Sequence, residues 1–99
     1  MKILVFDTET TGLPERDAPL IAVHRWPYIV QLSYLIFDTI ENKITKTVDH
    51  IIKLPDGVKI SPESENIHHI SNKMVKEKGV DIKNELEKFN EILLEVDLI

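Results

Sequence analysis

The hydrophobic pattern of this 99-residue chain changes its period about halfway along. Residues 2–6 form a nearly continuous apolar run, which predicts a short strand buried on both faces. The segments 29–38 and 44–54 are rich in β-branched residues or alternate in polarity, and the polar residues 41–43 between them predict a hairpin turn. The first half is therefore expected to form a three-stranded antiparallel meander with the 29–38 strand at its centre. Residues 15–28 have no clean period and predict a long loop.

The second half carries the sequence signals of helices. Ser61 before Pro62 is typical of a helix start, Ser71 is a second cap for a helix that stops at Gly79, and a third helix is expected from Asp81. The first helix is expected to carry Ile67, His68 and Ile70. The third has apolar residues at spacings of four, three, four and three, which predict a core stripe: Ile82, Leu86, Phe89, Leu93 and Val96.

The composition limits the class of protein. With 42% hydrophobic and 29% charged residues the chain is typical of one small globular domain. It has no apolar stretch near the roughly 20 residues that cross a bilayer and no signal-peptide pattern, so we expect an intracellular protein without a membrane partner. The net charge of −5 argues against a broad nucleic-acid footprint but allows a narrow one that uses metal ions.

Two acids, Asp7 and Glu9, directly follow the first apolar run. A strand alternates its side chains between faces, so both carboxylates are expected to point the same way at the strand's carboxyl end. The chain has no cysteine, and a metal would have to be bound by oxygen and perhaps imidazole. Oxygen ligands favour Mg²⁺ or Mn²⁺. The flanking residues 10–13, Thr-Thr-Gly-Leu, would let a ligand approach closely.

Three separated blocks of sequence carry a specific resemblance. They are FDTETTGL from Phe6, WPYIVQLSYLIF from Trp26, and IHHIS from Ile67 with Met74-Val75 behind it. Together they resemble the DnaQ-like, or DEDD, family of 3′-to-5′ exonucleases. The resemblance implies an α/β, ribonuclease H-like exonuclease fold that is incomplete, with residues 1–99 as the N-terminal part of a single exonuclease domain. Residues 96–99 look like the end of a helix and the opening of a fourth strand, so we expect the domain to be truncated there.

The resemblance implies a two-metal phosphodiesterase that acts on the single-stranded 3′ end of DNA or RNA. Asp7 matches the acid that bridges both metals, and Glu9 matches the acid that binds one metal near the attacking water. Thr10, Leu13 and His68 match residues that contact the terminal nucleotide. The alternative interpretations are a turn-stabilising hydroxyl for Thr10, an ordinary buried leucine for Leu13, and a packed or solvent-facing histidine for His68.

The family pattern also needs two more acids and, in its commonest branch, a histidine, and the chain lacks those blocks. We therefore expect the isolated chain to be inactive, and a polymerase or a complementing C-terminal segment is a possible partner. Gln31, inside an apolar strand, is expected to satisfy a buried backbone group, although it could also support the metal site. Two other functions remain: a haloacid-dehalogenase-like phosphatase with Asp7 as nucleophile, and a non-catalytic nucleic-acid-binding or regulatory module.

Overall fold

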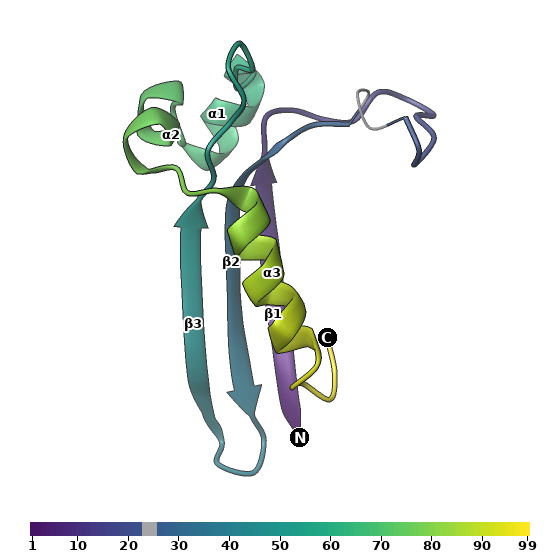
Figure 1. The fold of residues 1–99 in the computed structure, drawn as a ribbon, viewed down its shortest axis with the longest axis vertical. Coiled ribbons are helices and arrows are strands. Elements are labelled where there is room, and N and C mark those ends of the chain that lie inside the picture. Colours follow the sequence, from purple (N-terminus) through teal and green to yellow (C-terminus); the bar gives the residue numbers. More distant parts are fainter. Residues whose placement is uncertain (23–25) are drawn as a thin grey trace.

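A computed structural model describes residues 1–22 and 26–99. The strands and helices follow in the order β1 (Lys2–Thr10), β2 (Ile29–Asp38), β3 (Lys43–Ile51), α1 (Pro62–His68), α2 (Asn72–Lys78) and α3 (Ile82–Leu93). The strands form one antiparallel sheet in the order β1-β2-β3, which confirms the meander and the central place of β2. Figure 1 shows α3 lying in front of β2 and β1, roughly along the strands, while α1 and α2 sit beyond the carboxyl end of β1. Part of the predicted loop, residues 23–25, lies outside the described residues.

Strand β1 differs from its prediction in length and burial. It runs to Thr10 instead of ending at Phe6, and Val5 is 54% exposed. The expectation of a strand buried on both faces is therefore wrong. The reason is its position, because β1 pairs with β2 on one side and within the described residues no helix covers the sheet face opposite α3. Strand β3 is also shorter than expected and ends at Ile51.

Helix α3 packs its apolar side on the sheet and closes the main core. That core contains Leu4, Leu32, Tyr34, Ile36, Ile52 and Ile92, with Phe89 packed beside it. The rings of Phe6 and Tyr34 meet Phe89 edge to face, with centroids 5.4 and 5.2 Å apart. The predicted stripe is wrong at Leu86, which is 45% exposed, because the buried helix position is taken by Glu85.

Helices α1 and α2 begin as their sequence signals predict, and α2 also ends as predicted. The Ser61 and Ser71 hydroxyls accept hydrogen bonds from backbone N–H groups three residues on, and Gly79 caps the end of α2. Ile67 is exposed, however, and Ile70 lies after the end of α1 rather than on it. Ile70 is buried in a second cluster together with Val30, Ile60 and Val75. This small core holds the two short helices against the end of the sheet.

The last residues lie along the free edge of β1. Leu98 pairs with Ile3 in parallel, and its carbonyl oxygen accepts a hydrogen bond from the Leu4 N–H at 2.8 Å. The Asp97 carboxylate accepts from the Lys2 N–H at 2.7 Å. Residues 97–98 therefore extend the sheet pattern beyond β1 in a direction parallel to it. None of the helices in the described part of the chain is long and apolar enough to span a membrane.

Candidate active site on the open face of the sheet

Asp7 and Glu9 lie on the sheet face that α3 does not cover, which we call the open face. In the register, Asp7 is opposite Ser33 and Glu9 is opposite Gln31 on β2. Residues two apart on a strand share a face, so both carboxylates point to the side away from the core residues Leu32 and Tyr34. The Asp7 carboxylate also accepts a hydrogen bond from the Thr8 N–H at 2.9 Å.

A third acid, Asp49 on β3, shares the open face. Its Oδ1 atom accepts hydrogen bonds from the Gln31 amide and from the Ser33 hydroxyl, both at 2.8 Å. The expectation that Gln31 satisfies a buried backbone group is wrong, because its partner is a side chain on the neighbouring strand. Sequence reasoning missed Asp49 and Ser33, whose proximity depends on the β2–β3 register, in which Ser33 is opposite Asp49. An exact assignment of the turn between β2 and β3 would have fixed that register and so revealed the proximity.

The loop after β1 is fixed by its own hydroxyls and backbone. The Thr10 hydroxyl donates to the Gly12 carbonyl at 2.8 Å, as in a turn-stabilising role. Thr11 is buried, and it exchanges hydrogen bonds with the backbone of Tyr28 through both its N–H and its hydroxyl. Its carbonyl oxygen accepts from the Ser61 N–H at 2.8 Å. The carboxyl end of β1 is therefore tied both to the start of β2 and to the start of α1.

Leu13 and His68 differ in how free they are. Leu13 is 92% exposed, so it is not the ordinary buried leucine of the alternative interpretation. His68 is half-buried, and its Nε2 lies 3.0 Å from the carbonyl oxygen of Thr10 while its Nδ1 accepts from the Ile70 N–H. Leu13 belongs to the loop after β1, and His68 contacts the start of that loop through the Thr10 carbonyl oxygen. Their contact with a nucleotide stays a prediction.

The donor set of the open face fits a hard divalent cation. Asp7 and Glu9 offer carboxylate oxygens on one face, and oxygen ligands are those that Mg²⁺ and Mn²⁺ prefer. Across residues 1–22 and 26–99 there is no group of three or more histidine, cysteine, aspartate or glutamate side chains placed to hold a metal ion together. That Asp7 and Glu9 bind a metal stays a prediction; Mg²⁺ commonly keeps several of its waters where a protein supplies only one or two carboxylates.

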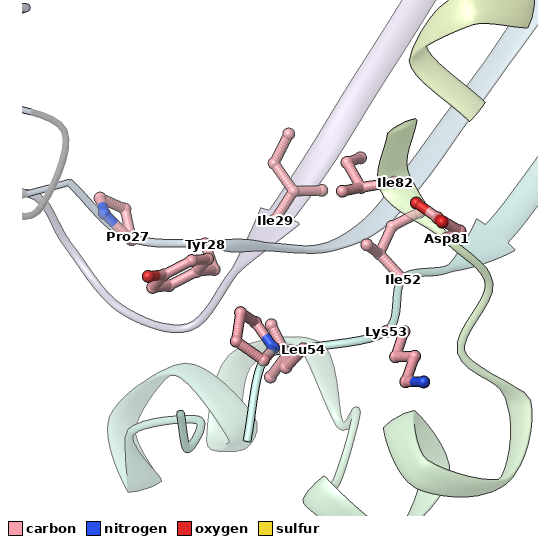
Figure 2. Close-up of a pocket in the computed structure, with 9 residues that line it drawn as sticks. Pro27, Tyr28, Ile29, Ile52, Lys53, Leu54, Asp81 and Ile82 are labelled. Carbon is pink, nitrogen blue, oxygen red and sulfur yellow. The ribbon is translucent and has the colours of Figure 1, made fainter. Parts of the chain in front are cut away.

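One hollow in the described structure is lined by Asp7, and a second, apolar one is lined by other residues. A shallow one of about 290 Å³ lies on the open face and is lined by residues that include Val5, Asp7, Ser33 and Asp49. A larger one of about 450 Å³ is apolar and contains neither Asp7 nor Glu9. Figure 2 shows that its side chains come from the approach to β2, the chain after β3 and the start of α3. The larger pocket is thus separate from the candidate metal ligands.

Comparison with known proteins defines the class of this chain. The family model described as Exonuclease matches residues 4–99. The search of curated proteins found no match. A solved structure of Exonuclease X with 5′ overhanging duplex DNA is 29% identical, with a TM-score of 0.60, over 88% of this chain and 42% of its own. Cell-death related nuclease 4 is 16% identical, with a TM-score of 0.67, over 95% of this chain and 30% of its own.

The nuclease domain of 3′hExo, a DEDDh family member bound to rAMP, is 17% identical, with a TM-score of 0.66, over 98% of this chain and 46% of its own. The chain spans less than half the length of each of these structures. Their shared fold confirms the ribonuclease H-like class, built here from three antiparallel strands followed by three helices. This chain belongs to the exonuclease family, and the family match excludes the haloacid-dehalogenase-like alternative.

Proposed function

We propose that this chain is the N-terminal part of an exonuclease domain that removes nucleotides from the 3′ end of single-stranded DNA or RNA inside the cell. The observation that carries the proposal is the placement of Asp7 and Glu9 together on the open face, at the carboxyl end of a strand, in a chain of the exonuclease family. Exonuclease X was solved in complex with 5′ overhanging duplex DNA and the nuclease domain of 3′hExo bound to rAMP, which supports either nucleic acid as substrate.

In the proposed site Asp7 and Glu9 hold two Mg²⁺ or Mn²⁺ ions. Such ions supply Lewis-acid activation of a water and stabilisation of the leaving 3′ oxygen. The exposed Leu13 is free to lie beside the terminal base. The Thr10 hydroxyl and the His68 ring flank the same loop. They can contact the terminal nucleotide if they exchange their present hydrogen bonds for bonds to it.

The metal site is tested on the 99-residue chain by adding Mn²⁺ and recording amide NMR signals, because a bound Mn²⁺ broadens nearby resonances. We expect the amides of residues 7–10 to broaden first. Asp7→Asn and Glu9→Gln should each abolish this selective broadening. Asp56→Asn, which removes the same charge from an exposed loop position, should leave it unchanged. Broadening that persists in Asp7→Asn would contradict the metal site. The binding-module alternative needs no metal at these residues and predicts no selective broadening.

The activity of this chain alone is a separate question. With two of the family's four acids, it should hold the ions weakly and cleave little or nothing. A 5′-labelled single-stranded oligonucleotide incubated with the chain and Mg²⁺ should stay intact. Cleavage that depends on Asp7 would show instead that two acids suffice. We propose that activity needs a partner, either a polymerase or a complementing C-terminal segment, that brings the remaining ligands.

A further inference from the structure

Asp49, Gln31 and Ser33 form a polar group beside the candidate metal ligands on the open face. The role that we assign to them is toward the same metal site, and so rests on the proposed function. Their hydrogen bonds connect β2 and β3. Asp49 lies on β3, Gln31 and Ser33 lie on β2, and the register puts Glu9 and Asp7 opposite them on β1.

The chemistry of Asp49 fixes what its two partners can offer to β1. An ionised carboxylate only accepts hydrogen bonds, so the Gln31 amide must turn its nitrogen toward Asp49. The amide group is planar, and its oxygen is therefore held on a side away from that bond. Ser33 has a single proton and donates it to the same Asp49 oxygen. Toward β1 it has only lone pairs left to offer.

The result is an arrangement of hydrogen-bond acceptors. Gln31 and Ser33 offer oxygen lone pairs next to Glu9 and Asp7, whose carboxylates also accept. Acceptors do not bond to one another, so on this solvent-facing sheet surface their lone pairs are open to donors such as water or to positive charge. The water shell of a hydrated divalent ion supplies both, because Mg²⁺ keeps several waters and each water carries two protons.

We propose that Asp49 is a positioning residue for the metal site, which it serves by orienting the Gln31 amide and the Ser33 hydroxyl as acceptors for the water shell of the bound ion. Outer partners of this kind fix ligand geometry, and their loss commonly costs about 10- to 100-fold in metal affinity. The role differs from direct ligation, since Asp49 acts through two other side chains.

The test uses the same Mn²⁺ titration of the 99-residue chain. Gln31→Met keeps the length of the side chain and its lack of charge but removes the amide, and Ser33→Ala removes the hydroxyl. We expect each to need several-fold more Mn²⁺ than the native chain for equal broadening at residues 7–10. Asp49→Asn should need about tenfold more, and Asp49→Glu should restore part of the affinity. Asp56→Asn is the charge-matched control and should behave as the native chain.

The variants separate positioning from simple charge. If Asp49→Asn weakens Mn²⁺ binding while Gln31→Met and Ser33→Ala bind as the native chain does, Asp49 acts only through its charge and the positioning role is wrong. If Asp7→Asn abolishes broadening but all three network variants bind normally, the proposed metal site stands and this inference fails. If Asp7→Asn has no effect, the metal site itself fails. Each variant must keep the native dispersion of the amide spectrum, which shows that it is folded. If another variant fails to fold, the result for Ser33→Ala, the smallest change, decides whether the positioning role is correct.

Discussion

The imidazole of His68, the last residue of α1, bridges to the end of β1 by placing its Nε2 3.0 Å from the carbonyl oxygen of Thr10. Its other nitrogen, Nδ1, accepts from the Ile70 N–H at 3.0 Å and so carries no proton. The proton therefore sits on Nε2, which donates to Thr10. The ring thus joins α1 to the loop that follows the candidate metal ligands. A nucleotide that bonds to either nitrogen must displace one of these contacts.

Replacing His68 should destabilise the fold. His68→Ala removes both hydrogen bonds and leaves the Ile70 N–H and one acceptor position of Thr10 without a protein partner, which predicts a loss of about 1–3 kcal/mol in the free energy of unfolding. Urea denaturation followed by circular dichroism measures it. Asn66→Ala, at an exposed position on the same helix, should change stability by less than about 0.5 kcal/mol. Equal effects of the two substitutions would argue against the bridge.

Replacing the next residue, His69, by glycine should stabilise the fold. His69 caps α1 in the left-handed region, with φ 60° and ψ 23°, where a side chain costs about 1–2 kcal/mol. His69→Gly should raise the free energy of unfolding by up to about 1 kcal/mol, since the gain is offset by the greater freedom of glycine in the unfolded chain. His69→Val should lower it, because a β-branched residue fits this region worst. A lower urea midpoint for the glycine variant than for the native chain would show that the cap is not strained.

Replacing Glu85 by an apolar residue should stabilise the fold. The Glu85 side chain is 6% exposed, and its Oε2 lies 3.6 Å from His50 Nε2 without a hydrogen bond. Lys88 Nζ reaches its other oxygen at 3.4 Å. A buried carboxylate costs free energy to desolvate, and because the side chains of Lys88 and His50 are exposed to solvent, its removal leaves no buried charge unpaired. Glu85→Met should therefore raise the melting temperature, and Glu87→Met, exposed on the same helix, should not.

Ionisation of Tyr34 should lower the stability of the fold at alkaline pH. Burial, and then the nearby Glu85 charge, raise the pKa of the Tyr34 hydroxyl above the ordinary value. The contribution of Tyr34 to the free energy of unfolding is fully present below the pKa of about 10 that tyrosine has in the unfolded chain. It is lost as pH rises through the higher pKa of the folded state. Tyr34→Phe should flatten this part of a stability profile between about pH 9 and 11, measured by urea unfolding. Glu85→Met should flatten it in part, and a profile identical to the native one in both variants would contradict this origin.

Gly79 allows the end of α2 to lie close against the backbone of Lys53 in the segment after β3. A Cβ atom added there would lie 2.4 Å from the Val75 carbonyl oxygen and 2.8 Å from backbone atoms of Lys53. Neither backbone can move without disturbing α2 or the chain after β3, so Gly79→Ala should cost about 1–3 kcal/mol. Gly12→Ala is the matched control, because its nearest atom, the Ser61 hydroxyl oxygen, would be 3.7 Å away, an ordinary contact. Thermal unfolding of the two variants should separate them clearly.

The residues that sequence reasoning placed correctly are those whose information is local. Helix starts at Ser61 and Ser71 depend on a side chain that bonds three residues on, and the pairing of Asp7 with Glu9 on one face depends only on strand alternation. The spacing on α3 predicted an amphipathic helix but wrongly placed Leu86 in its core stripe, where the structure buries Glu85. The way α3 packs on the sheet decided between the two, since Glu85 is buried and Leu86 is exposed.

The sequence by itself determined the family, the three strands and three helices, and the two acids at the end of the first strand. Tertiary structure decided which side chains from distant segments share the open face. Asp49 meets Gln31 and Ser33 only because the β2–β3 register aligns them, and His68 meets Thr10 across 58 residues only because α1 folds back on the end of β1. Such contacts depend on register and packing, which a local pattern of residues does not specify.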